Sequence, residues 1–403
     1  MNLLRINQNA KTDWPIIVLS FAMTTSVFTE RRIITGIGIP ELLILAMGGM
    51  VFSGRILKVP ETKEHSIIMQ YFKGVMITIP LGVLWNLVTV RSTFQMVHDF
   101  LAFCFAWYFS EFVLKNYITK ENVVEIIYLF LLFGFIVDVW YLKMYRGGSG
   151  YFADTTRFAG YSSDPNQVVE ALCFIPWLGL FFIDYIYQKK LPRFYIWGTI
   201  GAILLSIYIG HVTDSDSYNL SNMVACCMWA VAHKKLTGKS WPMIIALFVG
   251  IVYIIYSGGV SDVFGGMQNY YNEIATKDNQ LNTRVNVWKY GIIAFFHSPL
   301  FGNGPGAHSG NWGPFLKVES HNTYIYVLMD HGIIGLILLL TIFKNLSIKI
   351  IQSRSSYLFA AMSGLLVFCF FHSFQRMPLF WFYIFLFNRL AEFSMHCGVK
   401  RQQ

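Results

Sequence analysis

The chain has 403 residues, of which 55% are hydrophobic and 13% are charged, and its formal net charge is +9. Average soluble proteins carry about 25% charged residues, so this chain has too few to cover a water-soluble surface of its size. The composition excludes a disordered chain, a collagen and a disulfide scaffold, and it predicts a membrane protein with many spans. The basic excess fits Lys and Arg gathered in cytoplasmic loops, so no nucleic-acid partner is expected.

Twelve apolar segments approach the roughly 20 residues that a helix needs to cross a bilayer core. The predicted fold class is therefore all-α: a polytopic membrane protein of about 12 transmembrane helices, with residues 1–403 as a single integral membrane domain. No small-residue cleavage site follows the first apolar run, so we expect no cleaved signal peptide. The predicted spans are about 14–29, 33–54, 66–89, 96–114, 122–142, 166–187, 193–211, 218–233, 241–257, 322–343, 356–372 and 378–397.

The basic residues predict the orientation of these spans. With the N-terminus inside, the inner segments hold 19 Lys and Arg and the outer segments hold 11, which favours both termini in the cytoplasm. Most inner basic residues are Lys, whereas seven of the 11 outer ones are Arg. Arginine holds phosphate or carboxylate at two points, so the outer arginines indicate either a site for an anionic group or scatter in a small sample. They are Arg31, Arg32, Arg91, Arg146, Arg157, Arg284 and Arg376.

Two predicted outer loops are long enough to carry a function, since long irregular loops in compact proteins usually do. The first covers residues 143–165 and the second covers residues 258–320. Within the second loop, the apolar segment 285–300 predicts an amphipathic helix at the membrane surface, and a glycine-rich stretch follows it.

The second loop ends in a sequence pattern, His-Asn-x9-Gly-x-x-Gly, that runs into the tenth predicted span. It is formed by His321, Asn322, Gly332 and Gly335. Further stretches precede it in the order Arg157-Phe158-Ala159-Gly160, Asp164-Pro165-Asn166, Thr283-Arg284-Val285-Asn286-Val287-Trp288 and Pro299-Leu300-Phe301-Gly302-Asn303-Gly304-Pro305-Gly306. This ordered set resembles the O-antigen polymerase and O-antigen ligase superfamily, which are integral membrane glycosyltransferases of the bacterial envelope. The resemblance covers the region from Arg157 to Gly335, and elsewhere it extends to span count and topology.

His321 is the predicted catalytic residue. An imidazole titrates near neutral pH, so His321 can accept the proton of an attacking sugar hydroxyl as a general base. Asn322 is a candidate for orienting the imidazole or the sugar hydroxyl. For Gly332 and Gly335 we favour a packing role, because small residues three apart let helices approach closely.

The outer arginines are candidates for binding a lipid-linked pyrophosphate and stabilising it as the leaving group. Arg157 and Arg284 lead, because they come from the two long loops. Arg91, Arg146 and Arg376 are weaker candidates, with Arg376 the best of them because it lies in a short link between two spans.

Other polar residues are not named as catalytic. Asp99, Asp138, Asp330 and His331 fall in or near spans, where they could pair or reach a cavity. The Asp-x-Asp stretch at 214–216 is expected to be a solvated loop rather than a metal site. The superfamily commonly has a Ser-Arg pair after the seventh span, but residues 215–219 here contain no arginine. We expect neither a metal nor another cofactor.

The resemblance implies an O-antigen-type polysaccharide polymerase that joins glycan repeats carried on undecaprenyl pyrophosphate, with inversion at the anomeric carbon. It also implies a bacterial inner membrane location with the active site facing the periplasm. The expected partners are these lipid-linked glycans and the lipid bilayer, with the chain-length regulator and flippase of the same pathway as candidates. The alternatives are an O-antigen ligase, which transfers the glycan to lipid A–core, and a polysaccharide transporter. A transporter would place charged residues at mid-membrane, whereas the polar motifs here gather in one outer loop.

Overall fold

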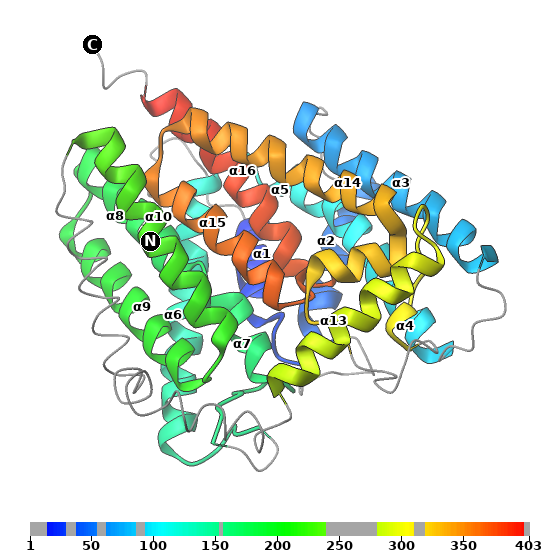
Figure 1. The fold of residues 1–403 in the computed structure, drawn as a ribbon. Coiled ribbons are helices and arrows are strands. Elements are labelled where there is room, and N and C mark those ends of the chain that lie inside the picture. Colours follow the sequence, from blue (N-terminus) through cyan, green and yellow to red (C-terminus); the bar gives the residue numbers. More distant parts are fainter. Residues whose placement is uncertain are drawn as a thin grey trace.

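The structure is a computed structural model that describes residues 14–29, 38–54, 62–85, 93–152, 156–238, 280–309 and 319–398. Within these ranges the chain is helical, with one isolated bridge between Tyr151 and Phe158 (Figure 1). The elements are α1 (Trp14–Thr25), α2 (Ile39–Phe52), α3 (Lys63–Trp85), α4 (Thr93–Tyr108), η1 (Phe109–Leu114), α5 (Lys115–Tyr117), α6 (Val123–Arg146), α7 (Pro165–Leu172), α8 (Ile175–Lys189), α9 (Arg193–Val212), α10 (Asp216–Thr237), α13 (Gln280–His297), η2 (Ala307–Ser309), α14 (Thr323–Ser353), α15 (Ser356–Phe371), η3 (Phe374–Arg376) and α16 (Pro378–Gly398).

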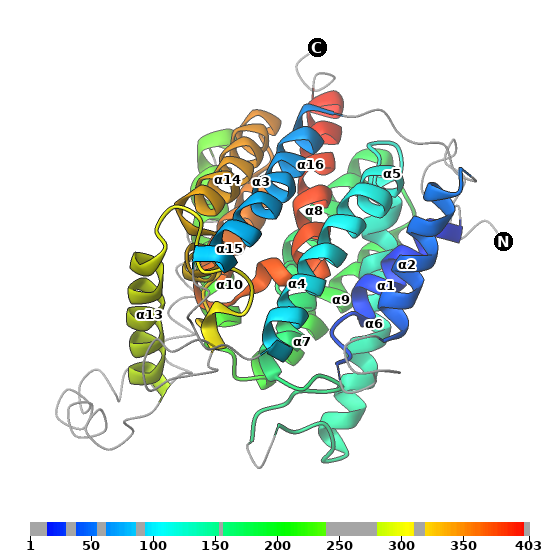
Figure 2. The ribbon, with the colours of Figure 1, turned by 90° about the vertical axis from the view of Figure 1, so that its right-hand side faces the viewer.

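These helices confirm the prediction of an all-α polytopic membrane protein. Eleven of the twelve predicted spans coincide with described helices, and the span at 241–257 lies outside the described residues. Six helical segments in the described part of the chain are long and apolar enough to cross a bilayer, and three shorter apolar helices accompany them. A helix, α13, also occupies most of the predicted amphipathic segment, and it lies along the outside of the bundle beside α14 (Figure 2).

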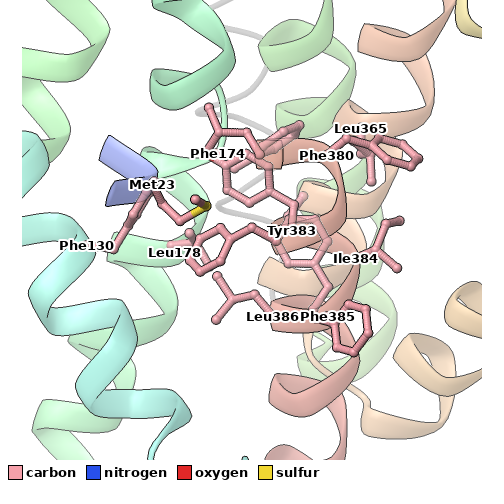
Figure 3. Packing of buried hydrophobic residues seen from close by; sticks show 14 of the residues in the cluster. Met23, Phe130, Phe174, Leu178, Leu365, Phe380, Tyr383, Ile384, Phe385 and Leu386 are labelled. Carbon is pink, nitrogen blue, oxygen red and sulfur yellow. The ribbon is translucent and has the colours of Figure 1, made fainter. Parts of the chain in front are cut away.

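α16 forms the centre of the bundle. Every residue from 379 to 387 is buried, so this helix is covered on all sides, as expected for an apolar helix inside a bundle. Tyr383 packs edge-on against Phe174, with ring centroids 4.7 Å apart (Figure 3), and its hydroxyl donates to the carbonyl of Ala171 at 3.0 Å. The buried hydroxyl is thereby satisfied, and α16 is tied to the region where α7 meets α8.

α14 is broken near its first third. Gly332 has φ 63° and ψ −163°, which interrupts the helical hydrogen bonds at this point. Residues of the glycine-rich loop replace them: Asn303 N donates to Met329 O at 2.7 Å and Gly304 N donates to Asp330 O at 2.9 Å. Beyond the break, Ile333 N donates to the carbonyl of Pro299 at 2.9 Å. Irregular backbone is tolerated at membrane depth only where the protein satisfies its polar groups, and the loop does so here.

The backbone of the glycine-rich loop around Gly302 therefore packs directly against the break at Gly332. A Cβ on Gly302 would lie 2.3 Å from His331 N, and a Cβ on Gly332 would lie 2.4 Å from Leu300 O. Both residues also have positive φ, which glycine adopts without strain. The packing role expected for Gly332 is present, but its neighbour is this loop rather than another helix, because the chain bends away from helical geometry at this residue.

Gly302→Ala should destabilise the protein by about 2 kcal/mol or more, since it adds both a steric clash and a strained φ. The measurement is the thermal unfolding midpoint in detergent. Gly198→Ala in α9 is the matched control, because a Cβ there meets nothing within 4 Å. It should leave the midpoint unchanged or raise it slightly, and equal losses in both variants would contradict this account of the loop.

Candidate active site

His321 lies at the start of α14 in a conformation that other residues hold in place. Its φ of 46° is in the left-handed region, which non-glycine residues seldom adopt. The carbonyl of the preceding Ser320 accepts a hydrogen bond from the indole of Trp288 at 2.8 Å, and Trp288 packs on Phe370. Backbone strain of this kind is typical of functional sites, where surrounding contacts maintain it.

Asn322 caps the helix that follows. Its side-chain oxygen accepts hydrogen bonds from the backbone N–H groups of Tyr324 and Ile325 at 2.9 and 3.0 Å. The side chain thus satisfies two of the free donors at the helix start. Its structural role is to fix the end of α14 directly beside His321.

A second histidine, His372, lies next to His321. The two rings are nearly perpendicular, with centroids 6.4 Å apart, and His372 stacks on Phe368. The carbonyl of His372 accepts a hydrogen bond from Thr323 Oγ1 at 2.6 Å, which joins the end of α15 to the start of α14. On its far side, His372 Nε2 lies 3.3 Å from Oε1 of Glu170, a fully buried carboxyl on α7.

Burial lowers the pKa of His372 below the usual range for histidine, and the neighbouring His321 lowers it further. The more distant carboxylates of Asp164 and Glu319 act in the opposite direction without reversing the shift. His372 is therefore neutral at physiological pH, and its ring offers one donor and one acceptor.

Arg376 and its partners form a cluster close to these histidines, which we call the arginine hub. Its members are Arg376, Asp99, Glu319 and Tyr326. Arg376 Nη1 donates to Asp99 Oδ1 at 2.9 Å, Nη2 donates to Glu319 Oε2, and the guanidinium lies over the ring of Tyr326 at 5.0 Å. Because Glu319 is two residues before His321, this hub also fixes the segment that carries the predicted base. A cavity of about 30 Å³ extends below it, lined in part by Asp99, Asp330, His331, Gln375 and Arg376.

Arg157 belongs to a neighbouring polar cluster. Its Nε donates to the carbonyl of Thr213 at 3.2 Å, and its Nη2 lies 3.5 Å from the amide oxygen of Asn166, which also accepts from Ser215. Asn166 and Glu170 are one turn apart on α7, so this helix connects the arginine to the histidine pair. Arg157 thus reaches the region after α9, where residues 215–219 contain no arginine.

The other predicted residues have different surroundings. Arg146 is exposed at the end of α6, Arg91 lies outside the described residues, and Arg284 lies in α13 with a side chain outside the described part. Asp138 is fully buried in α6, and neither of its carboxylate oxygens has a hydrogen-bond partner among the described residues. In the Asp-x-Asp stretch both aspartates are exposed, but the stretch is not a loop throughout: Asp216 begins α10, and Ser215 is buried and contacts Asn166.

The sequence analysis did not identify three residues of the site, which are Glu170, Glu319 and His372. Glu319 directly precedes the Ser-His-Asn motif, and Glu170 lies one turn after the Asp-Pro-Asn stretch. Their nearness to these motifs could have identified both as candidates. His372 is the last residue of the predicted span 356–372 and has no motif around it. The described residues contain no cluster of three or more His, Cys, Asp or Glu that could hold a metal ion.

Glu170→Gln should preserve folding better than Glu170→Ala. The amide has the size of the carboxyl and keeps a polar group beside His372 Nε2, whereas alanine leaves the buried imidazole without this polar neighbour, at a cost of about 1–3 kcal/mol. Thermal unfolding in detergent compares the two variants. A glutamine variant as unstable as the alanine variant would show that hydrogen bonding does not account for the role of Glu170.

Comparisons with known proteins agree with this picture. A family model described as O-antigen ligase matches residues 200–340, a region that contains α10, α13, the glycine-rich loop, His321 and the break in α14. The chain is also 28% identical over 206 residues to the exopolysaccharide production protein ExoQ of Rhizobium meliloti. That match covers 46% of this chain and 45% of the relative, so the chain spans less than half of the relative's length. With the motif order and the helical membrane fold, these matches show that the chain is similar to members of the O-antigen polymerase and ligase superfamily.

Proposed function

We propose that this protein is a polysaccharide polymerase, a membrane glycosyltransferase that joins oligosaccharide repeats carried on undecaprenyl pyrophosphate. The observation that carries the proposal is the setting of His321. Its backbone is held in a strained conformation, a neutral histidine lies beside it, and an arginine hub holds the segment before it. A proton acceptor beside cationic groups is what glycosyl transfer from a pyrophosphate requires.

The proposed step is a direct displacement. His321 takes the proton from a hydroxyl of the acceptor sugar as its oxygen bonds to the anomeric carbon of the donor. The bond from that carbon to the pyrophosphate oxygen breaks, and the lipid pyrophosphate leaves with the electron pair. Attack from the opposite face inverts the anomeric centre.

Arginines supply the positive charge for the leaving pyrophosphate. Arg157 and Arg376 are the candidates whose side chains the structure describes near the histidines, and Arg284 joins them from α13. Fixed guanidinium groups act where negative charge develops, which is the role a metal ion has in other transferases. Arg91, Arg146 and Asn322 stay as secondary candidates.

The proposed location is the bacterial inner membrane, with both termini in the cytoplasm and His321 facing the periplasm. The bias of basic residues supports this orientation. The lipid-linked repeats would then reach His321 from the outer leaflet, and the flippase and chain-length regulator of the pathway are the proposed partners.

A ligase is the second candidate, and the family model described as O-antigen ligase favours it. The relative named for exopolysaccharide production favours polymer formation, as do the two long outer loops that each contribute an arginine. We place the polymerase first on these two observations.

His321→Ala should reduce glycan transfer by about 100-fold or more, the contribution typical of a general base. Transfer is measured with lipid-linked repeats and the purified protein in lipid nanodiscs. His297→Ala is the control, because His297 is an exposed histidine at the end of α13. Normal product ladders from a folded His321→Ala protein would refute its role as the base.

Deletion of the gene in its natural host should separate the two candidates. Loss of a polymerase leaves single repeats attached to their acceptor, whereas loss of a ligase leaves long chains on the lipid carrier. Lipid-linked and surface glycans are analysed by gel electrophoresis and mass spectrometry. Accumulated long lipid-linked chains would replace the polymerase with the ligase.

A further inference from the structure

Arg376 has two carboxylate partners that differ in how firmly they are held. The side chain of Asp99 is 3% exposed and that of Glu319 is 34% exposed. Each partner faces a different terminal nitrogen of the guanidinium, so one can leave while the other stays.

Asp99 is the fixed partner. Besides Arg376, its oxygens accept hydrogen bonds from the Tyr326 hydroxyl at 2.7 Å and from Gly306 N at 3.2 Å. The imidazoles of His98 and His308 lie 3.2 and 3.5 Å away. Together with the ring of Tyr326 beneath the guanidinium, these contacts hold the plane and position of Arg376 independently of Glu319.

Glu319 is the exchangeable partner. Its carboxylate meets Arg376 at the more exposed side of the hub. Burial alone would raise the pKa of this carboxyl, but Arg376 outweighs it and lowers the pKa to about 2. Glu319 therefore carries a negative charge at neutral pH and is a second anion on an arginine that Asp99 already pairs with.

We propose that Glu319 occupies an anion subsite of Arg376 and that a diphosphate group displaces it. A carboxylate and a phosphoryl group present similar oxygen pairs to a guanidinium, and the dianionic group binds more strongly. Nε of Arg376 is buried without a hydrogen-bond partner among the described residues, so the guanidinium has a further donor to offer. The identity of the diphosphate, the lipid-linked donor, rests on the proposed function.

The exchange has a consequence for the predicted base. Glu319 is two residues before His321, so its release loosens one of the contacts that hold the histidine segment, while Trp288 retains its hydrogen bond to Ser320. Donor binding and the position of His321 are thereby linked. An empty site keeps Glu319 on Arg376.

Glu319→Gln tests this subsite directly. The amide carries no charge and competes weakly for the guanidinium, so binding of inorganic pyrophosphate to the protein in nanodiscs should tighten by about fivefold or more. A second arm replaces the probe with undecaprenyl pyrophosphate. A gain for both ligands assigns the subsite to the diphosphate itself, and a gain for the lipid alone assigns it to the diphosphate of the membrane-bound donor.

Three controls make the result specific. Asp214→Asn removes the same charge from an exposed aspartate with positive φ, a conformation that asparagine tolerates, and should not change binding. Glu319→Asp keeps the charge with a shorter reach and should give an intermediate gain. The gain should vanish in Glu319→Gln combined with Arg376→Gln.

Unchanged or weaker binding by folded Glu319→Gln would overturn the proposal, as would a gain that persists without Arg376. Because the assay measures binding without transfer, its failure leaves the proposed polymerase chemistry standing. Conversely, a fully active His321→Ala protein would remove the chemistry and leave the subsite intact.

Discussion

The contact between Asp99 and Arg376 is the interaction on which the rest of the site depends. It joins α4 to the short link between α15 and α16, and Asp99 also accepts from the glycine-rich loop and from α14. Four segments that are far apart in the sequence thus meet at one carboxylate. Removing one member of a buried ion pair typically costs about 3–5 kcal/mol, because the other charge remains in a medium of low polarity. The hub is therefore a fixed reference against which the more exposed Glu319 and the segment of His321 are positioned.

The break in α14 is the second constraint, and it explains in physical terms why glycine is required at positions 302 and 332. A helix interrupted within a membrane leaves backbone donors and acceptors that lipid cannot satisfy. The loop around Gly302 supplies the missing hydrogen bonds only because no side chain separates its backbone from that of Gly332. This fit fixes the first part of α14, from Thr323 to the break, at whose start His321 lies. Trp288 completes the arrangement from α13 by holding the carbonyl of Ser320. Gly302 and Gly332 therefore act by shaping the backbone beside the proposed base.

The sequence predicted the helices well because hydrophobic runs of bilayer length are a local signal. His321 could be named as a candidate because its motif is local too, and Arg376 because a cation in a short link between spans stands out. The partners of these residues could not be found in this way. Asp99 and Arg376 are 277 positions apart, and His372 meets a carboxyl on α7 that reads in sequence as one polar residue in an apolar span. Such pairs depend on which helices are neighbours, and hydropathy carries little information about that. The same reasoning explains Asn322: beside a histidine motif it suggests a substrate contact, yet its position before an apolar helix equally predicts the cap that the structure contains.

Electrostatic repulsion disfavours protonation of both His321 and His372 at the same time. Two positive charges at the 6.4 Å separation of the rings would repel each other by about 2–3 kcal/mol at an effective dielectric constant near 20. Only one ring can therefore carry a proton at moderate cost, and burial disfavours the charge on His372. In the proposed reaction, the proton released by an acceptor hydroxyl therefore settles on His321, while His372 stays neutral. The neighbouring carboxylate of Glu319 stabilises a charged His321 while it remains on Arg376. In the proposed exchange, the incoming diphosphate takes over that role as it displaces Glu319. The charge of the substrate thus supports the protonated state that the proposed reaction produces.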